Sequence, residues 1–205
     1  MKINSIFQAI EGEGTRIGTP KIFIRTQGCD MNCRNCDTPE ARDSKKGKEM
    51  TVKQIIDEVK KYPQRCVTIT GGDPMEQPHN ELLELIKELR RRRYHTTLEI
   101  TGSDESTPTV EKIFNKADFL SFDMKSPSAE ALFPFHKSSV GWNHKSQYKI
   151  VIERWEDYEF AKRMLRKYVA CDIVLTPRNE QMIKQLHEKV LKDGLKCKVI
   201  KRQEM

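Results

Sequence analysis

Three cysteines lie close together in the chain, at Cys29, Cys33 and Cys36, in the spacing Cys-x3-Cys-x2-Cys. A disulfide would use two of these thiols and leave the third unpaired, and a structural zinc ion ordinarily takes four ligands. Thiolates also hold iron–sulfur clusters, and a four-iron cube takes one ligand per iron. Three cysteines would therefore leave one iron open to a small molecule. The spacing indicates a cluster loop over residues 28–38, with a zinc loop or a redox thiol cluster as alternatives.

This spacing resembles the cluster loop of radical S-adenosylmethionine enzymes. The resemblance implies that a [4Fe–4S] cluster binds S-adenosylmethionine at its open iron and cleaves it to a 5′-deoxyadenosyl radical. It also implies that residues around the third cysteine contact S-adenosylmethionine, here Asn35, Cys36 and Asp37. Asn35 stands where the superfamily usually has an aromatic residue next to the adenine.

The composition limits the class of protein. The 205 residues, of which 33% are charged, suit a single domain spanning residues 1–205. The net charge of +7 is spread over helical stretches such as residues 87–93, which are typical of solvated helix ends, so nucleic-acid binding is disfavoured. The charge suits an anionic substrate or an acidic electron donor such as flavodoxin. With neither an apolar run near the roughly 20 residues of a membrane span nor a secretory signal, we expect a cytoplasmic protein without a membrane partner.

Apolar strands alternate with helical patterns along most of the chain. Strands are expected at residues 3–10, 21–26, 66–70, 96–100, 119–123, 147–152, 172–175 and 197–200, and helices at 51–62, 80–93, 109–115, 155–168 and 180–192. This alternation predicts βαβ units and a mainly parallel sheet. There are too few units for a closed eightfold barrel. We therefore predict an α/β fold with about six mainly parallel strands in a partial, open (β/α) barrel of the radical S-adenosylmethionine type.

Polar, glycine-bearing segments follow four successive strands, at residues 28–38, 71–74, 101–103 and 123–127. Because the carboxyl ends of parallel strands meet at one edge of a sheet, these segments are expected to form one site. Gly-Gly-Asp-Pro at 71–74 resembles the superfamily's Gly-Gly-Glu-Pro motif, and residues 99–103 resemble its ribose-side segment. The resemblance implies that further contacts to S-adenosylmethionine come from Gly72, Glu99, Asp123, Met124 and Lys125.

Residues 7–14, Arg25, the Cys36-Asp37-Thr38 triplet and residues 123–128 and 148–152 resemble the 7-carboxy-7-deazaguanine synthase family. The resemblance covers most of the chain up to about residue 180 and is weakest over 180–205. It implies a lyase that converts 6-carboxy-5,6,7,8-tetrahydropterin to 7-carboxy-7-deazaguanine with loss of ammonia, in deazapurine biosynthesis of the queuosine type. It also implies a homodimer, a reducing partner and Mg²⁺ bound by Thr38, since Mg²⁺ prefers oxygen ligands.

Arg25 offers a planar pair of N–H donors suited to a carboxylate, so it is expected to hold the substrate's carboxyl group. No side chain beyond the cluster and the radical is expected to be catalytic.

Two positions depart from the family pattern: Glu11 replaces the usual glutamine, and the chain ends at residues 203–205 without a Gln-x-His segment. The other substrate contacts that the resemblance implies are Ile10, Glu11, Gly12, Glu13 and Thr70.

Two alternative functions stay open on the sequence. A glycyl-radical-enzyme activase shares the cluster loop and the small size but acts on a large protein, whereas Arg25 and the turn at residues 11–14 favour a small carboxylated substrate. A non-catalytic metal-binding module is the second alternative.

Overall fold

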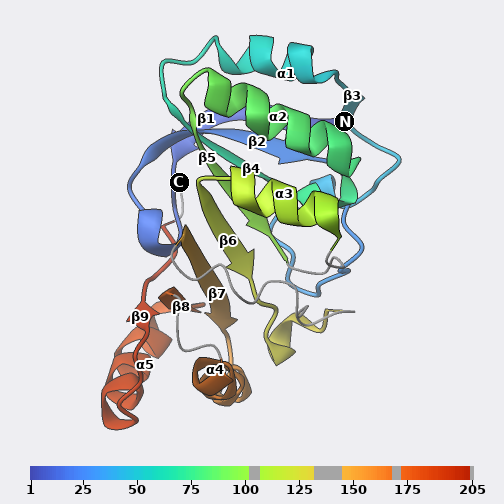
Figure 1. Ribbon diagram of the computed structural model, residues 1–205. Helices are drawn as coiled ribbons and strands as arrows, with labels where there is room; N and C mark the ends of the chain where they lie inside the picture. Colours follow the sequence, from blue (N-terminus) through green and yellow to red (C-terminus); the bar gives the residue numbers. More distant parts are fainter. Residues whose placement is uncertain (102–106, 132–144, 168–171, 204–205) are drawn as a thin grey trace.

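The computed structural model describes residues 1–101, 107–131, 145–167 and 172–203, which build one mixed sheet with helices packed against it (Figure 1). The strands of this sheet lie in the order β3-β1-β2-β4-β5-β6-β7-β8-β9. Their bounds are β1 (Lys2–Ile10), β2 (Pro20–Thr26), β3 (Lys48–Glu49), β4 (Cys66–Gly71), β5 (His95–Ile100), β6 (Phe119–Asp123), β7 (Ser146–Ile152), β8 (Asp172–Pro177) and β9 (Lys198–Val199).

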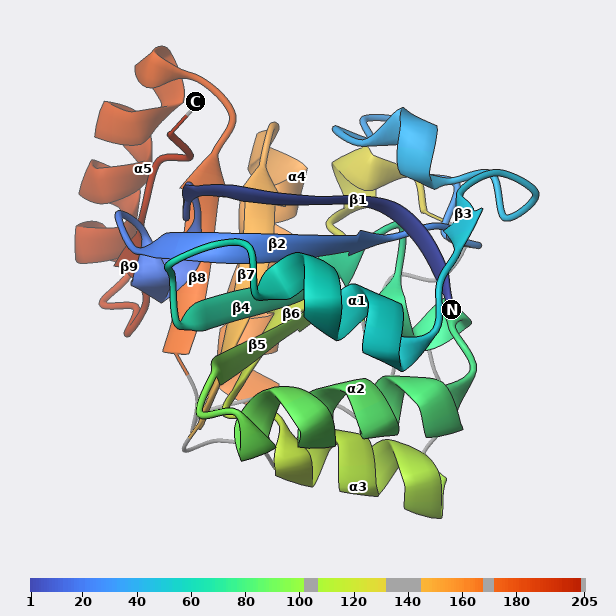
Figure 2. The same cartoon turned by 90° about the horizontal axis from the view of Figure 1, so that it is seen from above.

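The strands from β2 through β4 to β9 are parallel to their neighbours, whereas β1 pairs antiparallel with β2 and β3 antiparallel with β1. The two views show the sheet turning strongly between β1 and β8 without closing (Figures 1 and 2). The predicted α/β, partial open barrel is therefore confirmed. The sheet has more strands than the expected six or so. Strand β3 has two residues and carries no periodicity to detect, whereas β9, also of two residues, lies within the strand expected at residues 197–200.

The helices follow the expected pattern with small shifts at their ends. Their bounds are α1 (Val52–Val59), α2 (His79–Arg91), α3 (Pro108–Lys116), α4 (Trp155–Lys167) and α5 (Glu180–Lys192), with short 3-10 turns η1 (Gly14–Arg16), η2 (Pro39–Ala41), η3 (Pro74–Glu76) and η4 (Pro127–Ala129). Thr51 caps α1 in a reciprocal capping box with Gln54. None of the described helices is long and apolar enough to cross a membrane.

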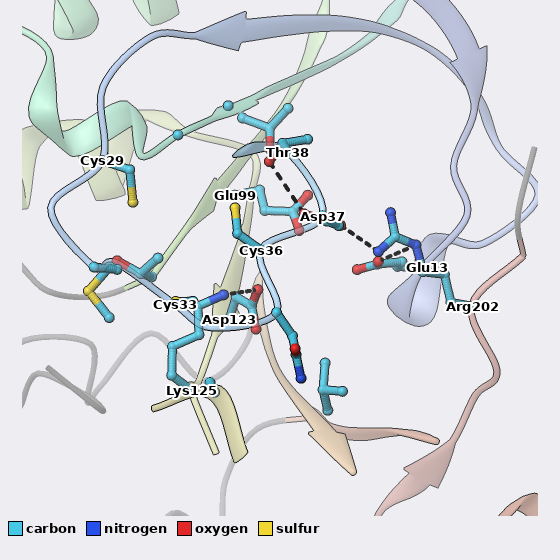
Figure 3. A pocket seen from close by; sticks show the side chains of 18 of the residues that line it. Glu13, Cys29, Cys33, Cys36, Asp37, Thr38, Glu99, Asp123, Lys125 and Arg202 are labelled. Atoms are coloured by element: carbon cyan, nitrogen blue, oxygen red, sulfur yellow. Dashed lines mark hydrogen bonds and ion pairs between the residues drawn. The ribbon is translucent and has the colours of Figure 1, made fainter. Parts of the chain in front are cut away.

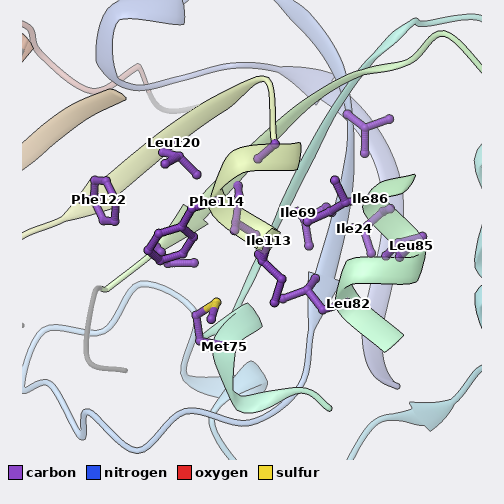
Figure 4. Packing of buried hydrophobic residues seen from close by; sticks show 14 of the residues in the cluster. Ile24, Ile69, Met75, Leu82, Leu85, Ile86, Ile113, Phe114, Leu120 and Phe122 are labelled. Carbon is purple, nitrogen blue, oxygen red and sulfur yellow. The ribbon is translucent and has the colours of Figure 1, made fainter. Parts of the chain in front are cut away.

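Helices α2 and α3 bury apolar side chains against the outer face of the sheet. Figure 4 shows Leu82 and Ile86 of α2 beside Ile24 and Ile69 of β2 and β4, and all four side chains are fully buried. Close packing of this kind makes the strands a rigid support. The loops at their carboxyl ends are thereby held in fixed relative positions.

Asp157 of α4 fixes the segment that follows β6. Its buried carboxylate accepts hydrogen bonds from the Ser128 hydroxyl at 2.7 Å and the Ser128 amide at 2.9 Å. It also accepts from the amides of Glu153 and Arg154, both at 2.9 Å, at the start of α4. Four donors on one carboxylate tie η4 to α4 and so hold one wall of the site described next.

Candidate active site

A cavity of about 370 Å³ lies at the carboxyl ends of the parallel strands (Figure 3). Its walls come from the loop after β1, the cysteine loop after β2, the ends of β4, β5 and β6, and the tail after β9. The convergence expected from the strand order is therefore present. Of the residues proposed from the sequence, those lining the cavity are Ile10, Glu11, Gly12, Glu13, Arg25, Cys29, Cys33, Asn35, Cys36, Asp37, Thr38, Thr70, Gly72, Glu99, Asp123 and Lys125.

Met124 differs from the other proposed residues. Its side chain is fully buried in the hydrophobic core and does not line the cavity. Successive residues of extended chain point to opposite sides, so Asp123 and Lys125 face the cavity while Met124 faces the core. The Met124 side chain is therefore not placed to contact a ligand in the cavity. Within the expected ribose-side segment, Thr101 lines the cavity, and Gly102 and Ser103 lie outside the described residues.

The cysteine loop folds back on residues 41–42. The Gly28 amide donates to the Ala41 carbonyl at 2.8 Å and the Cys29 amide to the Arg42 carbonyl at 3.1 Å. Gly28 has a φ of +110°, which a glycine adopts readily and other residues do not. The loop thus depends on a glycine directly before the first cysteine.

The three cysteines carry free, partly exposed thiols that face the cavity from different sides (Figure 3). Within the described part of the chain, no three His, Cys, Asp or Glu side chains are placed to hold a single metal ion. A four-iron cube instead takes each cysteine on a different iron. Three soft thiol donors spread around one cavity are a suitable donor set for such a cluster.

Burial of the thiols favours protonated Cys29 and Cys33 while no cluster is bound. Burial raises the pKa of Cys29 to about 11, and burial also raises the pKa of Cys33, although the Lys125 ammonium opposes this second shift. Lys125 lies 2.7 Å from Asp123, whose charge raises the lysine pKa against the effect of burial. Cluster binding must displace the thiol protons, and the Lys125 cation assists this at Cys33.

The Gly71-Gly72-Asp73 segment packs tightly against the cysteine loop. A Cβ on Gly72 would lie 2.1 Å from the Gly28 carbonyl oxygen and 2.6 Å from the Ala41 carbonyl oxygen. The Asp73 amide donates to that same Gly28 carbonyl at 2.8 Å. The end of β4 therefore holds the start of the cysteine loop through backbone contacts.

Asp73 has a structural role that the motif alone did not indicate. Its carboxylate is fully buried and accepts a hydrogen bond from the Met75 amide at 2.9 Å. It also accepts hydrogen bonds from the amide and the hydroxyl of Thr101. Burial raises the pKa of Asp73 against the effect of these hydrogen bonds. The side chain thus ties the end of β4 to the end of β5, and it does not line the cavity.

Arg25 lies at the cavity on the side of β1 and β2. Its guanidinium is 5.3 Å from the centre of the Phe7 ring, and Nη1 lies 3.2 Å from Glu40 Oε1. Its Nε is buried and has no hydrogen-bond partner among the described residues. The Arg25 side chain is 25% exposed and lines the cavity, which is the position expected for a residue that binds a carboxylate.

Glu11 is compensated by a buried lysine. Lys21 Nζ lies 2.9 Å from Glu11 Oε2, and the lysine side chain is 1% exposed. A carboxylate in place of the usual glutamine adds a negative charge to a buried position, and such a charge is tolerated when it is paired. The Lys21 partner explains how this chain accommodates the substitution.

Lys149, Arg202 and Gln203 belong to the site but were not assigned from the sequence. Lys149 pairs with Glu13 at 2.6 Å and with Glu99. Arg202 Nε lies 3.0 Å from Glu13 Oε1, and its Nη1 pairs with Asp37, so the tail joins the cysteine loop to the first turn (Figure 3). The charge and hydrogen bond of Arg202 lower the pKa of Asp37 although burial opposes this.

Thr38 has its hydroxyl at the cavity, 3.3 Å from Asp37 Oδ1. It occupies the position before η2 but its side chain makes no capping hydrogen bond there. The hydroxyl and the neighbouring carboxylate are both oxygen donors of the kind that Mg²⁺ takes.

Comparisons with known proteins agree on one family. Residues 10–127 match the family model described as a 4Fe-4S single cluster domain. The chain is 31% identical over 196 residues to a 7-carboxy-7-deazaguanine synthase of Aquifex aeolicus, covering 93% of this chain and 82% of the relative. It is 28% identical over 203 residues to the synthase of the same name from Thermoplasma acidophilum, covering 98% and 93%.

Two solved structures share the fold. The crystal structure of QueE from Escherichia coli superposes with a TM-score of 0.73 at 22% identity, covering 97% of this chain and 92% of that one. Streptococcus suis SuiB bound to S-adenosylmethionine superposes with a TM-score of 0.61 at 13% identity, covering 86% and 45%.

An open, mainly parallel α/β sheet with a three-cysteine loop at the carboxyl ends of its strands defines a radical S-adenosylmethionine enzyme with a [4Fe–4S] cluster. Within that class the relatives are specific, and the chain belongs to the 7-carboxy-7-deazaguanine synthase family. The glycyl-radical activase alternative is not favoured, because the matched relatives are synthases.

Proposed function

We propose that this chain is a lyase that converts 6-carboxy-5,6,7,8-tetrahydropterin to 7-carboxy-7-deazaguanine and ammonia. The observation that carries the proposal is the single cavity in which the three cysteines meet Arg25 and the Glu11–Gly12 turn, in a member of this family. The test is to incubate the reduced, iron-loaded protein with S-adenosylmethionine, Mg²⁺ and the carboxytetrahydropterin and to detect the deazaguanine. Cleavage of S-adenosylmethionine without deazaguanine formation would mean that the substrate is a different one.

The cluster and S-adenosylmethionine, when bound, supply a carbon radical that removes a hydrogen atom from the pterin ring. Cys29, Cys33 and Cys36 would hold the cluster. The Lys125 cation beside Cys33 suits the carboxylate of S-adenosylmethionine, and Gly72, which lines the same cavity, would meet its amino group through the backbone. The residues that we propose to contact S-adenosylmethionine are Asn35, Cys36, Asp37, Gly72, Glu99, Asp123, Lys125 and the backbone of Met124.

On the substrate side, Arg25 would bind the carboxylate through its part-exposed guanidinium and the Glu11–Gly12 turn would line the pterin edge. Glu11 keeps a second carboxylate oxygen besides the one paired with Lys21, so it can still accept from a ring N–H. The residues that we propose to contact the pterin are Ile10, Glu11, Gly12, Glu13, Arg25 and Thr70.

Replacing Arg25 by alanine should raise the substrate KM by about 10- to 100-fold, because a charge-assisted hydrogen bond contributes about 1.5–3 kcal/mol. Release of 5′-deoxyadenosine without substrate should persist, since Arg25 is not part of the cysteine loop. Substrate titrations with product detection measure the first effect, and chromatography measures the second. Arg163→Ala, an exposed arginine on α4, is the matched control and should change neither. An unaltered KM in Arg25→Ala would remove Arg25 from the substrate site.

Mg²⁺ at Thr38 is proposed from the family resemblance and from the two oxygen donors of Thr38 and Asp37 beside the cavity. Product formation should depend on added Mg²⁺, and that dependence should be lost in Thr38→Ala. Rate measurements over a range of Mg²⁺ concentrations test the site.

We also propose an acidic flavodoxin-like protein as the electron donor. Residues 42–48 contain Arg42, Lys45, Lys46 and Lys48 and contact the cysteine loop through the Arg42 carbonyl. A K45E/K46E variant should lower the flavodoxin-supported rate about tenfold at low salt but leave the dithionite-supported rate unchanged. The control is K60E/K61E directly after α1, another exposed lysine pair. Equal flavodoxin-supported rates in all three proteins would place the donor elsewhere.

Family membership supports a homodimer, which light scattering measures. The free thiols of the cysteine loop suit a reducing compartment, which supports a cytoplasmic location. We also propose that residues 1–205 form one domain, since the described strands belong to one sheet.

A further inference from the structure

A buried lysine joins two glutamates at the inner end of the cavity. Lys149 of β7 is 4% exposed, and its ammonium lies 2.6 Å from Glu13 and also pairs with Glu99. Glu13 comes from the loop after β1 and Glu99 from the end of β5. The lysine therefore connects the side of the cavity proposed for the pterin with the side proposed for S-adenosylmethionine. Burying three ionised groups is costly unless each is compensated, so their protonation states are coupled.

The three carboxylates at this end of the cavity differ in the cations that they face. Glu11 pairs with Lys21, and Glu13 pairs with both Lys149 and Arg202. Within the described residues, Glu99 pairs only with the Lys149 ammonium that it shares with Glu13. Burial raises the pKa of Glu99 to about 7 although Lys149 opposes this, and the charges of Glu13 and Glu11 add to the rise. Glu99 is therefore the carboxyl group that can exchange a proton near neutral pH.

A second, small cavity of about 10 Å³ lies behind these side chains. Glu11, Glu13 and Glu99 line both cavities, and Lys149 and Thr97 line only the small one. The buried Thr97 hydroxyl has no hydrogen-bond partner within the described part of the chain. The volume is about that of one water molecule, which Thr97 and the carboxylates could hold. Glu99 thus stands between the substrate cavity and a polar space through which protons can pass.

We propose that Glu99 is a catalytic acid–base group that gives a proton to the nitrogen leaving as ammonia and takes one back from a ring carbon, with Lys149 as its positioning residue. The inference rests on the proposed function, in which substrate and product differ by one ammonia. As the carbon–nitrogen bond breaks, its electron pair stays on nitrogen, which takes the Glu99 proton. As a ring C–H bond breaks, its electron pair forms a carbon–carbon double bond and its proton returns to Glu99. These steps need no oxidant or reductant.

The test uses Glu99→Gln, which keeps the size of the side chain and an acceptor for Lys149 but removes the exchangeable proton. Product formation should fall about 100- to 10,000-fold, the range typical of general acid–base groups. Because Glu99 is also proposed to contact S-adenosylmethionine, affinity for that cofactor and substrate-free 5′-deoxyadenosine release are measured in the same variant, and both should fall by less than about tenfold, well short of the loss of product formation. Glu99→Asp, which restores a carboxyl group, should recover part of the product formation, and Glu84→Gln, on the exposed face of α2, should behave as the unmodified chain.

The pH dependence has a definite sign. The reaction begins with protonated Glu99, so product formation should fall as pH rises through about 7, and the residual rate of Glu99→Gln should lack this decline. The charged groups that act on Glu99 are Glu11 and Glu13 from the first turn, Lys149 from β7 and Arg202 from the tail, and Asp123 of β6 acts in turn on Lys149 and Arg202. The raised pKa values of Lys149 and Arg202 and the lowered pKa of Asp123 keep these three charged over this range.

A measurement without the cluster separates this proposal from the proposed function. In the metal-free protein with ¹³C-labelled glutamate carboxyl groups, one NMR resonance should titrate near pH 7 and be absent only from Glu99→Gln.

Product formation by Glu99→Gln at the unmodified rate would overturn the proposal. Parallel loss of S-adenosylmethionine binding and product would also overturn it, because Glu99 would then be a cofactor ligand only. If the unmodified chain makes no deazaguanine while the resonance titrates as expected, the proposed function fails and the titration of Glu99 stands.

Discussion

Replacing Cys33 by alanine should abolish 7-carboxy-7-deazaguanine formation. The three cysteines of the loop are the thiols that line the cavity, and each would bind a different iron. Removal of Cys33 leaves two protein ligands for the cube, which cannot hold it in place beside Lys125. Product should fall below detection, a loss of at least about 1,000-fold if one iron ligand is as costly as a lost catalytic nucleophile or base.

The same samples give a second measurement in iron and sulfide content and visible absorbance after anaerobic reconstitution. Cys66→Ala is the matched control, because Cys66 is also a partly exposed free cysteine but lies at the start of β4, away from the cavity. It should keep the full iron content and product formation. Normal product formation by Cys33→Ala would contradict the assignment of the cluster loop.

The fold could be predicted because its determinants are local and periodic. Helix α1 begins where Thr51 and Gln54 form a capping box, and each apolar strand segment carries its own pattern. The convergence of the site followed from topology alone, since parallel strands place their carboxyl ends at one edge. The two-residue strand β3 could not be predicted, because it forms only by pairing with a strand distant in sequence, whereas β9 lies within the strand expected at residues 197–200.

The site was predicted less completely where a role depends on contacts distant in sequence. Lys149 left one detectable signal, a charged residue within the buried strand β7, but its partners Glu13 and Glu99 could not be identified before the chain was folded. Arg202 left no signal, since it is one of many charged residues near the C-terminus. Met124 was assigned through its motif, whereas strand alternation places its side chain in the core. Motif resemblance thus locates the ligand-binding segments but does not say which side chains reach the ligand.

Replacing Gly72 by alanine should displace the cysteine loop and reduce both cluster content and product formation by more than about tenfold. The added methyl group would lie 2.1 Å from the Gly28 carbonyl oxygen and 2.6 Å from the Ala41 carbonyl oxygen, and both are backbone atoms that no side-chain rotation can move aside. The loop must shift, and overpacking of this kind costs about 1–3 kcal/mol or more. Because Gly28 directly precedes Cys29, that shift moves the first cluster ligand.

Iron content, the thermal unfolding midpoint and product formation together test this expectation. Gly194→Ala is the control. Gly194 follows α5, has a φ of +62° and has open space where a Cβ would lie, so an alanine there adds backbone strain but no steric clash. It should lower stability by about 1 kcal/mol and leave the iron content unchanged. If Gly72→Ala loses stability as Gly194→Ala does but keeps its cluster, the contact between β4 and the cysteine loop does not position the cluster. If it loses the cluster as well as stability, while Gly194→Ala loses stability alone, the contact between β4 and the cysteine loop positions the cluster, which is the outcome that the short Gly72–Gly28 approach favours.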